Sequence, residues 1–135
     1  MILQKKHHLY YNLEFLATKV YIYFDIDHFK KKCLKMKYSK DILDQLDPTH
    51  GKCLEYSTAS GHQEIYIYAH HLPVVVHEIT HAVTFIMERY NIVDDEFRAY
   101  MTDFLFQLSF EFLDSESAQK NYNSAINQGE KNDKK

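Results

Sequence analysis

Residues 74–87 read VVVHEITHAVTFIM, and this stretch decides how the chain folds. Neither Gly nor Pro interrupts it, and Pro73 stands where a helix would begin, so the pattern predicts a long α-helix from residue 73 to about residue 90. Within this helix His77 and His81 are four residues apart and therefore share one face. Both imidazoles can then reach a single metal ion, and Glu78 is close enough to act on a water molecule there.

His77, Glu78 and His81 form the His-Glu-x-x-His signature of zinc-dependent peptidases. In that chemistry Glu78 is the general base, which takes a proton from zinc-activated water and delivers it to the leaving nitrogen of a peptide bond. The sequence therefore predicts a zinc-dependent peptidase with one Zn²⁺ per chain and a peptide or protein substrate. The competing interpretation is an ordinary solvated Glu between two structural histidines.

The remaining pattern predicts an α+β fold, in which a small twisted β-sheet packs against two long helices. Strands are expected at residues 20–24, 52–57 and 63–69, and the last two should form a hairpin. Short helices are expected after Asp27 and after Ser39, which can cap them. A second long helix should run from residue 94 or 95 to about residue 113, with an apolar stripe of Phe97, Met101, Phe104, Leu105, Leu108 and Phe112.

The third zinc ligand is the main question that the motif leaves open. Catalytic zinc usually takes three protein ligands, and no histidine follows His81, so the metzincin arrangement is excluded. We favour Glu96, because a short connection makes the two long helices antiparallel neighbours. Glu96 also begins a polar stripe with Tyr100, Asp103 and Gln107 on an otherwise apolar helix, and a buried stripe needs a partner such as a cation. The alternatives that stay open are Asp94, Asp95, Asp103, His70 and His71.

Three further roles can be assigned around the predicted zinc site. Tyr100 could donate a hydrogen bond to the oxyanion, although a core tyrosine is an equal reading. Asp103 could orient a ligand histidine through its Nδ1–H, although a surface Asp is an equal reading. The strand that precedes the metal helix could bind an extended substrate by β-addition, through Ile65, Tyr66, Ile67 and Tyr68.

A His-Glu-x-x-His helix followed by a Glu-bearing helix resembles the gluzincin side of the zincin superfamily. The segments VHEITHAV and DEFRAY look most like very short metallopeptidase domains of phages and prophages. These are similar to the ImmA/IrrE peptidases, whose Glu-x-x-Ala motif is Glu96-Phe97-Arg98-Ala99 here. The resemblance covers roughly residues 66–108 and implies a minimal zincin fold, a zinc cofactor and Glu96 as third ligand. Tyr100 departs from the family pattern. A carboxamide or carboxylate that supports the metal ligands is usual one turn after the Glu ligand, and Asp103 would take this role here.

Composition and hydropathy give no support for nucleic-acid binding or membrane association. A net charge of −3 gives no reason to expect nucleic acid as a partner. No stretch reaches the roughly 20 apolar residues of a membrane span, and the N-terminus lacks a signal-peptide pattern, so a cytoplasmic protein without membrane association is expected. Cys33 and Cys53 are expected as free thiols. Residues 1–113 should form a single domain, and residues 114–135 a polar, disordered tail.

Two readings other than an enzyme fit the same sequence. The first is a non-catalytic regulatory or binding protein on a zincin scaffold, in which the zinc site is structural or vestigial. A fourth protein ligand, such as His71 or Asp103, would close the site and favour this reading. The second is a metal-free helical interaction protein. A minimal peptidase domain can also depend on a protein partner for substrate delivery.

Overall fold

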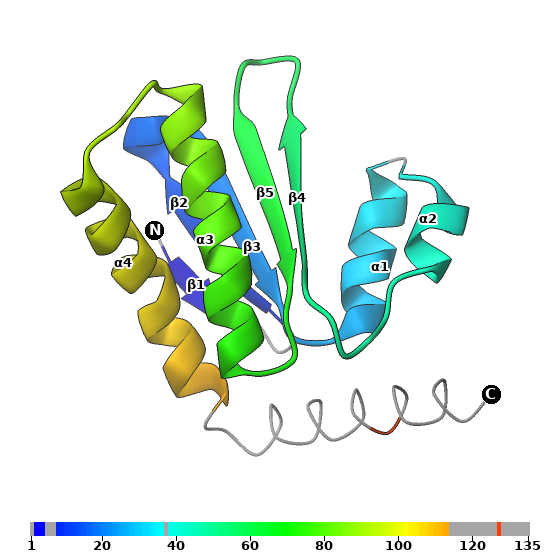
Figure 1. Ribbon diagram of the computed structural model, residues 1–135. Helices are drawn as coiled ribbons and strands as arrows, with labels where there is room; N and C mark the ends of the chain where they lie inside the picture. The colour runs from blue at the N-terminus through cyan, green and yellow to red at the C-terminus, as the bar shows by residue number, and fades with distance from the viewer. Residues whose placement is uncertain (1, 5–7, 37, 114–126, 128–135) are drawn as a thin grey trace.

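The computed structural model describes residues 2–4, 8–36, 38–113 and 127, and these parts of the chain form an α+β fold (Figure 1). They contain one mixed sheet with the strand order β1-β2-β3-β5-β4. β3 and β5 run parallel, whereas the other neighbouring strands run antiparallel. The strands are β1 (Ile2–Gln4), β2 (His8–Leu13), β3 (Thr18–Tyr23), β4 (Lys52–Ser57) and β5 (Gln63–Tyr68). The predicted α+β class and the β4–β5 hairpin are confirmed, while β1 and β2 were not expected from the sequence.

Helices α3 (Leu72–Arg89) and α4 (Asp95–Leu113) lie antiparallel on one face of the sheet (Figure 1). Pro73 stands in the first turn of α3, where its missing N–H leaves no hydrogen bond unmade. The chain leaves α3 through Tyr90 and Asn91, and Asn91 takes the left-handed conformation with φ 53° that commonly ends a helix. The buried residues of α3 recur every three or four positions: Val75, Glu78, Ile79, Ala82, Val83, Ile86 and Met87.

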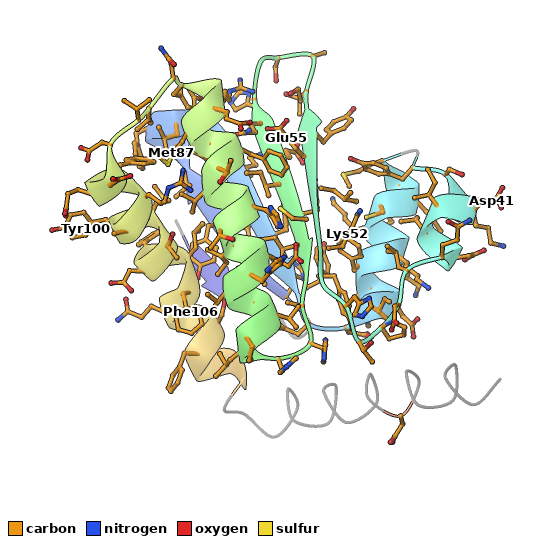
Figure 2. The ribbon with its side chains drawn as sticks, in the orientation of Figure 1. Asp41, Lys52, Glu55, Met87, Tyr100 and Phe106 are labelled. Atoms are coloured by element: carbon orange, nitrogen blue, oxygen red, sulfur yellow. The ribbon has the colours of Figure 1, made fainter. Side chains whose placement is uncertain are left out.

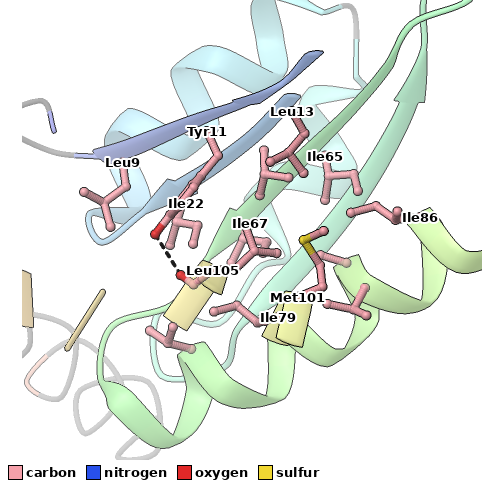
Figure 3. Close-up of a cluster of buried hydrophobic side chains, with 14 of the residues drawn as sticks. Leu9, Tyr11, Leu13, Ile22, Ile65, Ile67, Ile79, Ile86, Met101 and Leu105 are labelled. Carbon is pink, nitrogen blue, oxygen red and sulfur yellow. Dashed lines mark hydrogen bonds between the residues drawn. The ribbon is translucent and has the colours of Figure 1, made fainter. Parts of the chain in front are cut away.

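The larger hydrophobic core lies between the sheet and these two helices (Figure 3). Leu9, Tyr11 and Leu13 alternate along β2 and are buried on the helix-facing side. The Tyr11 hydroxyl donates a hydrogen bond of 2.9 Å to the Leu105 carbonyl of α4. A buried hydroxyl without a partner would cost about 1–3 kcal/mol, so this bond helps to fix α4 against β2.

The opposite face of the sheet is partly covered by α1 (Ile26–Lys35) and α2 (Lys40–Asp44). The sequence predicted Asp27 as the cap of α1, but the cap is Asp25, whose carboxylate accepts a hydrogen bond from the Asp27 amide at 3.2 Å. Asp27 itself lies in the first turn, where the helix dipole also favours an acid. Ser39 precedes α2, as expected.

Several sequence predictions concern the chain as a whole. Cys33 and Cys53 are free thiols, as predicted. In the described part of the chain, no helix has the length and apolar character that a membrane span requires. The predicted polar tail at residues 114–135 lies outside the described residues, except for residue 127.

Candidate metal centre

His77 and His81 stand one turn apart on the exposed side of α3, and their rings converge. Their Nε2 atoms are 3.3 Å apart, and the ring centroids are 4.9 Å apart. Two zinc–nitrogen bonds of about 2.0–2.1 Å at a tetrahedral angle would place the nitrogens about 3.3–3.4 Å apart. The spacing therefore fits two ligands of one zinc ion. The same distance also suits a hydrogen bond between the two imidazoles, with the donor set by their tautomers.

Glu78 points to the side of α3 that faces β4, and only 6% of its surface is exposed. Burial raises the pKa of the carboxyl group, and His77, His81 and Lys52 oppose this effect by lowering it. The Gly51 backbone comes so close that a Cβ added there would lie 2.8 Å from Glu78 Oε1. The carboxylate is therefore held in a partly desolvated position beside the histidine pair.

A cleft opens directly next to this group. It has a volume of about 410 Å³, and the turn before β4 forms one side while the first turns of α3 form the other. The lining residues are Thr49, His50, Gly51, Pro73, Val74, His77 and Glu78. A side chain or peptide segment of a ligand could therefore reach Glu78 and His77 together.

Glu96 does not join the histidine pair. It lies in the first turn of α4 and its side chain is exposed, whereas His81 lies eight residues, or about 12 Å, before the end of α3. Antiparallel helices bring together residues that are equally far from their connection, so the neighbours of His81 lie further along α4. In the described part of the chain, no group of three His, Cys, Asp or Glu side chains is placed to hold a metal.

The polar stripe on α4 faces solvent, which removes the reason for expecting a cation beside it. Glu96, Tyr100, Asp103 and Gln107 are all exposed. The apolar residues Met101 and Leu105 carry the buried side of the helix instead. The stripe therefore needs no buried partner, contrary to the sequence-based argument.

Tyr100 is too far round α4 to serve as an oxyanion donor. Arg98 donates a hydrogen bond of 3.1 Å to Thr84 of α3, and Tyr100 follows about 200° further round the helix. Tyr100 is 71% exposed and points outward from α4 (Figure 2). It lines a separate apolar pocket with Leu13 and Phe15 at the β2 side, so the structure does not bring Tyr100 to the histidine pair.

Asp103 is also separated from the histidines. It lines a groove on α4 with Phe106, Gln107 and Phe110, and the described contacts give it no ion pair or hydrogen bond with His77 or His81. The prediction that Asp103 orients a ligand histidine is therefore not supported by this geometry.

The predicted substrate strand is an interior strand. β5, with Ile65, Tyr66, Ile67 and Tyr68, pairs with β3 on one side and with β4 on the other. All four side chains are buried: Ile65 and Ile67 belong to the core with α3 and α4, and Tyr66 and Tyr68 belong to the cluster with α1 and α2. β-Addition requires a strand with a free edge, so this prediction is wrong. In the described sheet, the terminal strand next to Glu78 is β4.

His70 and His71, the upstream alternatives for the third ligand, follow β5 and precede α3. Their ring centroids are 4.2 Å apart, and His70 also stacks on Tyr68 at 6.4 Å. Burial, helped by the neighbouring His71, lowers the pKa of His70 to about 4. His70 is therefore neutral at pH 7 and forms part of the packing between the sheet and the start of α3.

The lowered pKa of His70 predicts a loss of stability in acid. An unfolded His70 takes up a proton near pH 6.5, whereas the folded protein resists protonation until about pH 4. The unfolded state thus binds more protons in this window, so the free energy of unfolding should fall by up to about 3 kcal/mol between pH 6.5 and 4. Urea unfolding across this range should show the fall in the wild type and a smaller one in His70→Phe. His62→Phe, at an exposed position, is the control; an equal slope in His70→Phe would contradict the assignment.

His50 lines the cleft, and sequence patterns did not single it out. His50 lies in the turn DPTHG at residues 47–51, a pattern that predicts a turn and nothing more. The fold of the chain brings this turn against α3, more than twenty residues later. The one sequence signal that could have pointed to this contact is Gly51, because glycine allows a close approach of the backbone to another element.

Comparisons with known proteins identified no relative of this chain. The chain matches no protein-family model, and no match was found among curated proteins or among solved structures.

Proposed function

We propose that this protein is a zinc-dependent peptidase of minimal zincin type. The observation that carries the proposal is that His77 and the buried carboxylate of Glu78 line one cleft, while the Nε2 atom of His81 lies 3.3 Å from that of His77. His77 and His81 would hold the metal. When bound, a zinc ion lowers the pKa of water towards 7 and polarises a carbonyl group.

Glu78 supplies the proton transfer in this proposal. Its carboxylate accepts a proton from the attacking water and returns it to the amide nitrogen that leaves. A general base works best when its pKa lies near the working pH, and burial shifts the pKa of Glu78 upwards in that direction. Gly51 supports this role because it has no Cβ: a Cβ there would lie 2.7 Å from Glu78 Cγ and 2.8 Å from Glu78 Oε1, in the space that the Glu78 side chain needs.

The substrate would be an extended peptide. β4 follows the cleft-lining turn directly and is a terminal strand in the described sheet, with exposed side chains at Lys52, Glu55 and Tyr56. Main-chain hydrogen bonds along such an edge would align a peptide of many sequences beside Glu78. This supports peptides over small molecules as the substrate class.

A non-catalytic binding protein with a vestigial or structural zinc site is the second candidate. The observation in its favour is that no third metal ligand stands beside the histidine pair among the described residues. The open cleft next to Glu78 disfavours a structural zinc site, because such a site is normally closed by four protein ligands.

Peptide cleavage separates these two candidates. Wild-type protein loaded with one equivalent of zinc should cut a mixed peptide library, with new termini read by mass spectrometry. Chelation should abolish the cuts, and added zinc should restore them, because the metal supplies the activated water. Identical cleavage products before and after verified zinc removal would count against a zinc-dependent enzyme, and no cleavage at all by the zinc-loaded protein would favour the binding protein.

A further inference from the structure

We propose that an apolar pocket between β2 and α4 is a docking site for a basic, amphipathic peptide segment of another protein. This β2–α4 pocket has a volume of about 340 Å³, and every side chain that lines it is apolar or aromatic: Leu13, Phe15, Phe97, Tyr100, Met101 and Phe104. It shares no residue with the cleft beside Glu78. The inference therefore does not depend on the proposed zinc site.

The floor of the β2–α4 pocket is fixed by the hydrophobic core. Leu13 and Met101 are both buried and belong to that core. The Phe104 ring packs edge-on against the buried ring of Tyr11, with centroids 5.6 Å apart. The Tyr11 hydroxyl is in turn hydrogen-bonded to the Leu105 carbonyl of α4 (Figure 3). A peptide would meet a surface that is already formed, which lowers the entropic cost of binding.

The opposite wall of the pocket is the short 3₁₀ helix η1 (Glu14–Leu16), which presents Phe15. The Thr18 hydroxyl donates a hydrogen bond of 2.8 Å to the Leu16 carbonyl. The Tyr90 hydroxyl, at the end of α3, donates to the same carbonyl. The backbone beside Phe15 is therefore fixed to both the sheet and α3.

Three aromatic rings of the pocket are exposed to solvent. Phe15 is 76% exposed, Tyr100 is 71% exposed and Phe104 is 41% exposed. Tyr100 points outward from α4 (Figure 2). Adjacent exposed apolar side chains of this kind mark interaction sites, and aromatic residues contribute much of the binding energy at protein interfaces. The pocket therefore suits the apolar side chains of a partner.

The rim of the pocket is acidic. Three exposed carboxylates are next to lining residues along the chain: Glu14, Glu96 and Asp103. Arg98 is the one basic residue in such a position, and it donates a hydrogen bond of 3.1 Å to Thr84 of α3, on the other side of α4. Complementary charges at a rim speed association and select the partner. A partner with Lys or Arg beside its apolar side chains therefore fits this pocket.

The same charges disfavour two other occupants. In a symmetric dimer formed through this pocket, the rim carboxylates of one copy would face those of the second copy. An anionic membrane surface would be repelled in the same way. A peptide with one apolar side and basic residues beside it complements the lining and the rim together.

Selection from a random peptide library tests the chemistry of the partner. The library is displayed on phage and selected on full-length Glu78→Gln, which cannot cut the peptides under the proposed function. Peptides that also bind the same protein with Phe15→Ser and Tyr100→Ser are removed. The remaining sequences should combine apolar side chains with an excess of Lys and Arg over Asp and Glu. Both substituted rings are exposed, and circular dichroism with urea unfolding verifies that the variants are folded.

The affinity of one selected peptide, measured by fluorescence anisotropy, then separates the pocket from its rim. Phe15→Ser should weaken binding about fivefold or more, as expected for an aromatic anchor. Glu96→Gln and Asp103→Asn together should weaken binding by about two- to tenfold at low salt. This second effect should nearly vanish at about 1 M salt, because exposed charges are then screened.

Ile42→Ser and Asp44→Asn are the matched controls, because both residues are exposed on α2, and they should bind the peptide as the wild type does. Selected peptides that are acidic, or no peptide whose binding depends on Phe15 and Tyr100, would overturn the proposal. A wild-type dimer that dissociates in Phe15→Ser would also overturn it and assign the pocket to a second copy. All these results are independent of zinc content and peptide cleavage, so they leave the proposed function untouched.

Discussion

Replacement of Glu78 by Gln is expected to slow peptide hydrolysis by about a hundred- to ten-thousandfold, the usual contribution of a general base. The amide has almost the shape of the carboxylate but cannot accept the proton. Zinc content should stay at the wild-type level, because Glu78 is not proposed as a ligand. Stability should not fall either, because the buried carboxylate is already disfavoured by desolvation. Initial rates on a cleaved peptide, with zinc content measured on the same samples, give the result.

Glu88→Gln is the matched control for this experiment. Glu88 lies on the same helix and is exposed, so its substitution makes the same change in charge away from the cleft. Its hydrolysis rate should equal that of the wild type. Equal rates in Glu78→Gln and the wild type would mean that another group takes the proton, or that the cleavage comes from a contaminant.

Helix α3 was predictable because the residue pattern that determines it lies within the helix itself. The helical spacing of Val75, Ile79, Val83 and Ile86 fixes which side faces the sheet. Once that side is fixed, His77 and His81 must lie together on the exposed side of α3. Glu78 must then lie between this exposed side and the side that faces the sheet. These placements follow from one helix and do not depend on the rest of the chain.

The surroundings of the histidine pair were not predictable in the same way, because they depend on how separate elements meet. The choice of Glu96 assumed that the start of α4 returns to the motif, but an antiparallel helix starts beside the end of α3. The turn that contains His50 reaches α3 only through the position of β4 in the sheet. Residue spacing along the chain contains no information about such a contact.

In the sheet, residue patterns did not reveal strand β2 and did not show which strand lies at the edge. β2 has a clear alternation of Leu9, Tyr11 and Leu13, yet its other face also carries half-buried rings, such as Tyr10, which blur the contrast between apolar and polar positions. Overlooking β2 did not alter the predicted fold class. The substrate strand was misassigned because strand order decides which strand has a free edge, and order in the sheet differs from order in the chain.

The second large effect concerns the metal itself. His77 and His81 have no other role that the geometry makes evident: both are exposed, and neither belongs to the hydrophobic core. Replacement of either by Ala should therefore abolish zinc binding at low free zinc while leaving the free energy of unfolding of the metal-free protein nearly unchanged. An exposed substitution away from core and caps usually changes stability by no more than about 0.5 kcal/mol.

The most direct test is the zinc content of the purified full chain, measured by elemental analysis after dialysis against a low, buffered concentration of free zinc. The wild type should retain one zinc ion per chain, His62→Ala should retain the same amount, and His77→Ala and His81→Ala should retain almost none. A wild type that holds no zinc, or a His77→Ala/His81→Ala double variant that still holds one ion per chain, would contradict a metal centre on helix α3.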